Sequence, residues 1–114
     1  MKRIPQNKIY EILANLTGTV GLYIEDCTSG ETFTINPDYV FPSASVIKIP
    51  MLALLMRDAQ QRLIDLDAPH KIDDRNRVGG TGILCELSHD YVPSLRDMAK
   101  LMIVLSDNIA TNEI

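Results

Sequence analysis

Tryptophan is absent from this sequence, and other aromatic residues are few: two Phe and four Tyr in 114 residues. Aromatic side chains dominate many protein cores, so their scarcity leaves any core here to Leu, Ile, Val and Met. The hydrophobic fraction of 46% and the charged fraction of 23% are nevertheless those of an ordinary globular protein. The length fits one domain of common size.

Positive charge is also in short supply. The formal net charge is −4, the pI is near 5.0, and no run of Lys and Arg exceeds two residues. An acidic chain without basic clusters offers no attractive surface to phosphate groups. We therefore expect no nucleic-acid partner and no binding to anionic membranes.

Long hydrophobic runs are missing as well. No segment approaches the ~18 consecutive apolar residues of a membrane-spanning helix. The basic start, MKRIPQN, is not followed by the apolar core of a secretory signal. We expect no membrane span, a cytoplasmic location for the sequence as written, and a periplasmic or secreted one if a signal peptide was removed.

Metal-binding patterns are lacking too. Cys27 and Cys85 match no zinc or redox spacing, and we expect two buried or half-buried thiols rather than a disulfide. His70 and His89 lie in polar stretches without spaced partners, which favours a surface role for both. The acidic stretch 65–74 lacks the spacing of a calcium loop. No metal and no cofactor is therefore expected.

The first part of the chain has the pattern of a helix followed by a hairpin. Ile and Leu recur at near-helical spacing over residues 5–16, and Thr17-Gly18 offers a helix end. Alternating and β-prone residues then predict strands at roughly 19–26 and 31–36. We assign residues 1–43 to this helix and hairpin.

Residues 44–114 have helical patterns instead. The stretch 45–61 is apolar almost all round, which predicts a buried helix, with Pro50 in its first turn. Because proline cannot donate a backbone hydrogen bond, either the helix begins at Pro50 or one bent turn precedes it. Ser94 resembles the N-cap of a further helix, which the segment 106–108 interrupts.

Ser45 and Lys48 lie at the start of the apolar helix. Residues three apart share one helix face, so the hydroxyl and the amine could come within hydrogen-bond reach. A serine hydroxyl needs a base beside it to be a nucleophile, and a lysine can be that base if its pKa is lowered. The spacing alone does not distinguish this pair from two polar residues at a helix start.

A second polar motif, Ser106-Asp107-Asn108, lies between two predicted helices. Ser106 could relay a proton and Asn108 could offer its amide to a substrate carbonyl; the alternative is a helix end followed by a new N-cap. Ser-x-x-Lys followed by Ser-Asp-Asn resembles the signature of class A serine β-lactamases and related penicillin-recognising serine enzymes.

Other segments extend the resemblance. Residues 17–36 look like the family's first hairpin, 41–52 like its nucleophile helix, and 78–84 and 94–114 like parts of its helical domain. The resemblance implies an α/β class, as an α+β fragment: an N-terminal helix and β-hairpin followed by the helical-domain segment of an incomplete β-lactamase/transpeptidase-like fold.

The resemblance also implies roles for single residues. Ser45 would attack the β-lactam carbonyl to form an acyl-enzyme, and its backbone N–H would be half of an oxyanion hole. Lys48 would help remove the hydroxyl proton. Ser106 would shuttle a proton toward the lactam nitrogen, and Asn108 would hold the side-chain amide of the substrate.

The sequence departs from the family by omission. The family's pattern continues with a loop whose glutamate activates water and with a Lys-Thr-Gly strand; neither is present, and Glu113 and the other glutamates match other parts of the pattern. We expect the N-terminal portion of a β-lactam hydrolase, inactive or limited to acylation. An unpaired hairpin edge and an uncovered helix face would favour self-association or a complementing C-terminal half.

Two other functions remain open. A penicillin-binding D-Ala-D-Ala peptidase or transpeptidase would use the same serine and lysine, although Asp107 within the second motif favours the hydrolase. A non-catalytic interaction module could also retain this part of the fold.

Overall fold

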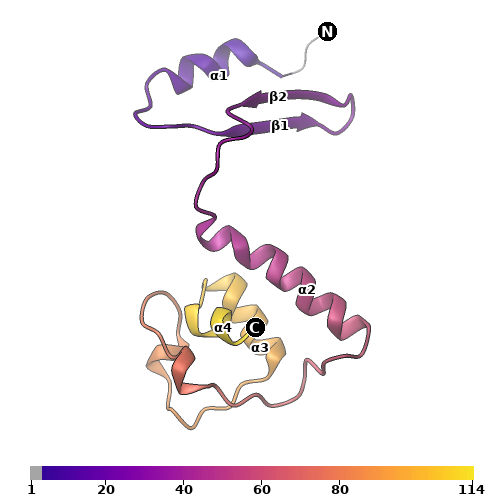
Figure 1. Cartoon of the computed structure of the whole chain (residues 1–114), viewed down its shortest axis with the longest axis vertical. Coiled ribbons are helices and arrows are strands. Elements are labelled where there is room, and N and C mark those ends of the chain that lie inside the picture. The colour runs from indigo at the N-terminus through magenta and orange to yellow at the C-terminus, as the bar shows by residue number, and fades with distance from the viewer. Residues whose placement is uncertain (1–3) are drawn as a thin grey trace. The chain divides into compact units, whose positions relative to one another are not determined.

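The computed structural model describes residues 4–114, which form two compact units. The division lies between Pro42 and Ser43, one residue before the boundary assigned from the sequence. We call the part up to Pro42 the hairpin unit and Ser43–Ile114 the site unit (Figure 1). Within residues 4–114 no helix is long and apolar enough to cross a membrane.

The hairpin unit consists of helix α1 (Gln6–Leu13) and the antiparallel strands β1 (Leu22–Asp26) and β2 (Glu31–Ile35) (Figure 1). Tyr10 of α1 meets Phe33 of β2 edge to face, with ring centroids 5.5 Å apart. Helix α1 is shorter than predicted because the chain turns after Leu13. Within residues 4–114 the sheet has only these two strands, so each keeps an unpaired edge.

Local chemistry forms the hairpin. The Asp26 carboxylate accepts hydrogen bonds from the backbone N–H groups of Thr28 (2.8 Å) and Ser29 (3.3 Å), which closes the turn. These bonds hold the pKa of Asp26 below its usual value. Gly30 has a φ of 71°, a conformation that favours glycine. The predicted hairpin is therefore present, with slightly shorter strands.

The site unit begins with the 3-10 helix η1 (Ala44–Ile47), which leads into α2 (Lys48–Gln60). Of the two arrangements that Pro50 left open, the structure has the one in which a distorted turn precedes the helix. Pro50 lies in the first turn of α2, where a backbone N–H has no partner within the α-helix, so the missing donor costs little.

Helices α3 (Leu95–Val104) and α4 (Asn108–Glu113) form the core of the site unit with the short 3-10 helix η3 (Leu84–Glu86). A further 3-10 helix, η2 (Asp74–Asn76), contributes no buried residue. Ser94 caps α3 as predicted, accepting a hydrogen bond of 3.1 Å from the Asp97 N–H. The buried cluster contains no aromatic residue; its members are Ile72, Leu84, Met98, Met102, Ile109 and Ala110.

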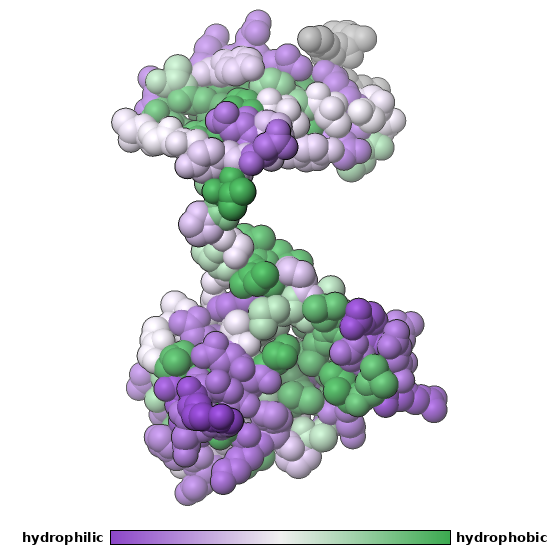
Figure 2. Space-filling view, viewed as in Figure 1, coloured by the Kyte–Doolittle hydropathy of each residue, from purple (hydrophilic) through white to green (hydrophobic). Residues whose placement is uncertain are grey.

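Helix α2 is less buried than its sequence predicted. Only Lys48 and Leu55 are buried, although Met51 and Leu52 pack against the core. Hydrophobic residues therefore remain on the surface of the site unit (Figure 2). The exposed ones on η1, α2 and the end of α3 are Val46, Ile47, Ile49, Leu54, Met56, Ile103, Val104 and Leu105.

The cysteine prediction is wrong in one respect. Cys27 and Cys85 are both free, but both are exposed rather than buried. Desolvation and the neighbouring Glu86 carboxylate raise the pKa of the Cys85 thiol, which lowers its reactivity at neutral pH.

Candidate active site

The residues of the two motifs come together at one place in the site unit. Ser45 lies in η1, Lys48 begins α2, Ser106 lies between α3 and α4, and Asn108 begins α4. A hollow of about 370 Å³ is lined here by Ser45, Val46, Lys48, Ile49, Met102, Ile103 and Ser106. Tertiary packing thus joins a helix start to a loop that is remote in sequence.

Hydrogen bonds connect these side chains in series. The Ser45 and Ser106 hydroxyl oxygens are 2.9 Å apart. Lys48 Nζ donates to the Ser106 hydroxyl at 2.8 Å, to the Ser106 carbonyl at 2.7 Å and to Asn108 Oδ1 at 3.3 Å. Within the described residues no hydrogen bond joins Ser45 and Lys48 directly. The Ser106 hydroxyl bridges them, which differs from the direct contact that their spacing suggested.

Lys48 is buried, with 5% of its surface exposed. An ammonium group has three N–H donors, and three oxygen atoms accept from it here. Among the ion pairs of residues 4–114, none includes Lys48, so neutral oxygens take the place of a carboxylate. Burying a charged group without such partners is costly, and this requirement explains why Nζ turns to the Ser106–Asn108 segment.

The backbone is left-handed at two positions of the site. Ala44, immediately before Ser45, has a φ of 43°, and Ser106 has a φ of 54°. Such conformations cost non-glycine residues roughly 1–3 kcal/mol each and persist only where the surroundings impose them. Asn36 and Arg62 share the feature outside the site, so strain marks the site without being unique to it.

Asp107 holds the second motif in place, a wider role than the N-cap that the sequence left open as an alternative. Its carboxylate is buried and accepts from the backbone N–H groups of Ile83 (2.7 Å), Leu84 (2.9 Å) and Ala110 (3.0 Å). The bond to Ala110 caps α4, so the alternative of a helix end followed by a new N-cap is confirmed. The bonds to Ile83 and Leu84 tie a distant loop to the same point.

The far end of α4 contains a second buried carboxylate. Glu113, with 4% of its side chain exposed, accepts from His70 Nε2 (2.5 Å), the Asp73 N–H (2.8 Å) and Asn76 Nδ2 (3.0 Å). Desolvation acts to raise the pKa of Glu113, but these hydrogen bonds hold it below its usual value. The surface role predicted for His70 is therefore incomplete, because this half-buried residue anchors α4.

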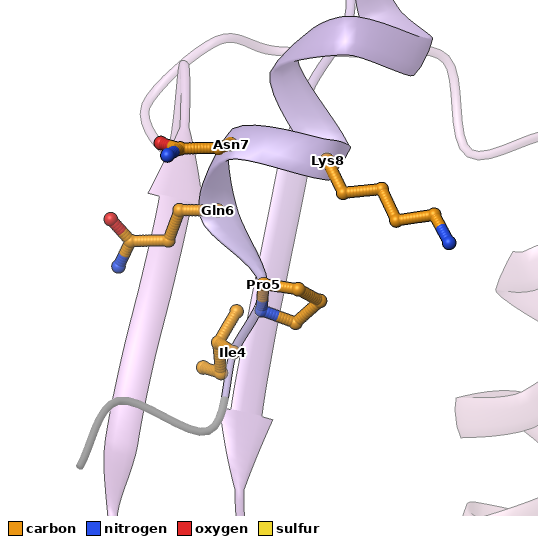
Figure 3. Close-up of a pocket in the computed structure, with 5 residues that line it drawn as sticks. All are labelled: Ile4, Pro5, Gln6, Asn7 and Lys8. Carbon is orange, nitrogen blue, oxygen red and sulfur yellow. The ribbon is translucent and has the colours of Figure 1, made fainter.

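Another hollow, of about 510 Å³, lies at the start of α1 and is lined by Ile4, Pro5, Gln6, Asn7 and Lys8 (Figure 3). Gln6 and Asn7 extend to one side and Lys8 to the other, so their polar groups do not converge. Within residues 4–114 no group of three or more His, Cys, Asp or Glu side chains is placed to hold a metal ion. The Ser45 site is thus the better candidate for chemistry.

Comparison with known proteins finds β-lactamases among the proteins similar to this chain. Beta-lactamase SME-1 of Serratia marcescens is 29% identical over 105 residues, which are 92% of this chain and 35% of SME-1. A β-lactamase structure from Sphaerobacter thermophilus is 35% identical, with a TM-score of 0.77 over 83% of this chain and 36% of its own.

The structure of PBP-A is also similar. It matches with a TM-score of 0.86 and 28% identity over 95% of this chain and 41% of PBP-A, and a PBP-A mutant is known as an acyl-enzyme complex with penicillin G. The chain spans about a third of the length of SME-1. A helix, a two-stranded hairpin and helices in this order form an α+β fragment of the β-lactamase fold. The family profile of the beta-lactamase enzyme family matches residues 4–114, and the chain belongs to that family.

Proposed function

We propose that this chain carries the acylation machinery of a serine β-lactam hydrolase, with Ser45 as the nucleophile. The observation that supports this most directly is the continuous series from the Ser45 hydroxyl through the Ser106 hydroxyl to Lys48 Nζ, with steps of 2.9 and 2.8 Å. A hydroxyl in such a series can lose its proton as it attacks a carbonyl carbon.

The proposed acylation proceeds through these groups in order. Once the Lys48 ammonium has lost a proton, Ser45 gives its proton to Ser106, which passes its own to the Lys48 amine. The Ser45 oxygen bonds to the lactam carbonyl carbon, and the Ser45 N–H at the start of η1 stabilises the oxyanion. When the lactam C–N bond breaks, Ser106 gives its proton to the nitrogen and recovers one from Lys48.

Asn108 is placed to hold the substrate. Its Oδ1 accepts from Lys48, so Nδ2 is directed elsewhere. Within residues 4–114 this Nδ2 donates to no protein acceptor, which leaves it free for the side-chain carbonyl of a penicillin. The role fits an amide whose oxygen is fixed by Lys48 and whose Nδ2 is not used by the fold.

Release of the acyl group is expected to be slow in this chain. Among residues 4–114 no Asp or Glu lines the hollow beside Ser45, so this part of the chain offers no carboxylate there to activate a water molecule. If this chain supplies only one oxyanion donor, acylation itself would also be slow, because loss of one donor costs ~10²–10³ in rate.

Mass spectrometry after incubation with penicillin G tests the proposal. The expected result is a covalent adduct that digestion places on Ser45 and that persists for hours, with none in Ser45→Ala. Thr34→Ala, in the hairpin unit, is the matched control and should acylate as the parent does. No adduct on Ser45 at any penicillin concentration would contradict the proposal.

The similarity to PBP-A supports a second candidate function, that of a penicillin-binding D-Ala-D-Ala peptidase or transpeptidase. A peptide ending in D-Ala-D-Ala discriminates the two. Release of D-Ala that depends on Ser45 would favour this candidate, whereas acylation by penicillin alone would favour the first. A non-catalytic interaction module predicts instead that Ser45→Ala leaves binding of its partner unchanged.

A further inference from the structure

The loop of Gly80, Thr81 and Gly82, here called the glycine loop, packs against the Ser106–Asn108 segment. The Asn108 N–H donates to the Thr81 carbonyl at 3.0 Å, and the Thr81 hydroxyl donates to the Ser106 carbonyl at 3.0 Å. The loop therefore contacts Ser106 and Asn108, two of the four residues that the proposed mechanism uses. Its role cannot be read from the two sequence motifs.

Gly80 leaves the space that the Asn108 amide occupies. A Cβ added at Gly80 would lie 2.6 Å from Asn108 Nδ2, closer than real side-chain contacts allow. Because Oδ1 of the same amide accepts from Lys48, the group cannot rotate away without losing that bond. Any side chain at position 80 must displace the amide or the loop.

Thr81 acts on the Ser106 carbonyl. This carbonyl accepts both from Lys48 Nζ at 2.7 Å and from the Thr81 hydroxyl at 3.0 Å, and it belongs to a residue with a φ of 54°. Two donors on one carbonyl hold the strained peptide in a single orientation. Thr81 itself is exposed, so its hydroxyl is not needed to fill the core.

We propose that the glycine loop positions the Asn108 amide and thereby sets a preference for substrates with an acylamino side chain. Thr81 is a positioning residue, since it acts through Ser106, and Gly80 keeps the approach to Nδ2 open. The proposal rests on the proposed function of the Ser45 site, and it assigns a substrate preference to residues outside both motifs.

Acylation by two penicillins tests the proposal. Penicillin G has an acylamino carbonyl, and 6-aminopenicillanic acid lacks it. Gly80→Ala should lower the rate of Ser45 acylation by penicillin G by about tenfold, the value of one hydrogen bond. The rate of Gly80→Ala with 6-aminopenicillanic acid should fall by less than about twofold. Thr81→Val loses the bond to the Ser106 carbonyl and should lower the rates with both penicillins. Thr81→Ser, which keeps a hydroxyl, should behave as the parent.

The chain offers matched glycine controls. A Cβ at Gly79 would meet nothing within 4 Å, so Gly79→Ala should leave both rates unchanged. Gly18 shares the left-handed backbone of Gly80, with a φ of 106° against 113°, but a Cβ there also meets nothing. Gly18→Ala therefore reports the cost of backbone strain without the steric effect. Equal losses with both penicillins in Gly80→Ala would overturn the substrate preference.

A measurement without substrate separates this proposal from the function on which it rests. In NMR spectra, Gly80→Ala and Thr81→Val should shift the side-chain amide signals of Asn108, and Gly79→Ala should not. Unchanged Asn108 signals in both variants would overturn the positioning role. A parent chain that shows these shifts yet forms no adduct with either penicillin would overturn the proposed function and the substrate preference, but not the positioning.

Discussion

Each of the two units of this chain is stabilised internally in a different way. In the hairpin unit, the turn is closed by Asp26 with Thr28 and Ser29, its immediate neighbours in sequence. In the site unit, Asp107 binds the backbone of Ile83 and Leu84, more than twenty positions away. An aspartate can therefore close a local turn or join two segments that are distant in sequence. Only the second role brings together residues of the candidate active site.

The largest expected effect comes from breaking the distant junction. Asp107→Ala would leave three backbone N–H groups without their acceptor, those of Ile83, Leu84 and Ala110. Since all three bonds are at least partly buried, we expect a loss of about 3–5 kcal/mol in the free energy of unfolding of the site unit. Urea denaturation measures this loss in the free energy of unfolding.

The exposed Asp90 supplies the control for this substitution. Asp90→Ala should change the unfolding free energy by less than about 0.5 kcal/mol. The hairpin unit should keep its NMR spectrum in Asp107→Ala, and loss of the hairpin signals would show that the two units do not differ as described.

Lys48→Met should have the next largest effect. Methionine fills similar space but leaves the Ser106 carbonyl, the Ser106 hydroxyl and Asn108 Oδ1 without their shared donor. We expect about 1–3 kcal/mol of destabilisation by urea denaturation and no Ser45 adduct by mass spectrometry. A variant with unchanged stability would show that these contacts contribute nothing to the fold.

The exposed apolar face of the site unit predicts self-association. Val104 and Leu54 are 76% and 51% exposed, and neither is needed for the core. Light scattering at increasing concentration should show a rising mass, and Val104→Lys should weaken association by about tenfold, as expected for removing ~1–2 kcal/mol of apolar contact. Tyr23→Lys, at an exposed residue of the hairpin unit, is the control. A parent chain that stays monomeric would contradict the prediction.

The lowered pKa of Glu113 predicts that the stability of the site unit depends on pH. Its pKa is lowered in the folded chain from a usual value of 4.5, so its contribution is present above that value and is lost as the pH falls through the folded pKa. The unfolding free energy of Glu113→Gln should therefore fall less steeply with acidity than that of the parent. Identical slopes below about pH 4.5 would contradict this.

Asp26→Ala should have the smallest effect. It removes two bonds from an exposed turn, each of which water can replace. We expect a loss of less than about 1 kcal/mol in the free energy of unfolding. The loss should be confined to the hairpin unit and be seen as faster amide exchange at Thr28 and Ser29. An effect on Ser45 acylation would indicate a link between the units that these contacts do not provide.

Much of the fold was predictable because its determinants lie close together in sequence. The hairpin and the Ser94 cap follow from local turn and capping chemistry. The burial of α2 was overestimated because an all-apolar pattern reports what a helix could bury and not what covers it. The exposure of Cys27 and Cys85 was missed because the hydrophobic character of a cysteine likewise does not tell whether other residues cover it.

The candidate site was only partly predictable. The motifs nominated Ser45, Lys48, Ser106 and Asn108, and the structure brings these four residues together. It also shows that Ser106 bridges Ser45 and Lys48, which spacing along a helix could not reveal. The anchoring by Asp107 and Glu113 and the contacts of Thr81 depend on segments 20 or more positions apart, for which one sequence contains no signal.

The sequence by itself determined the element order, the turn and cap residues, and the chemical groups available for acyl transfer, because these depend on neighbours along the chain. Only the tertiary structure decided which oxygen atoms surround Lys48, which backbone the Asp107 carboxylate holds, and how much space Gly80 leaves for Asn108. Those outcomes depend on the packing of α2, α3, α4 and the glycine loop, which places groups remote in sequence within 3.3 Å of each other.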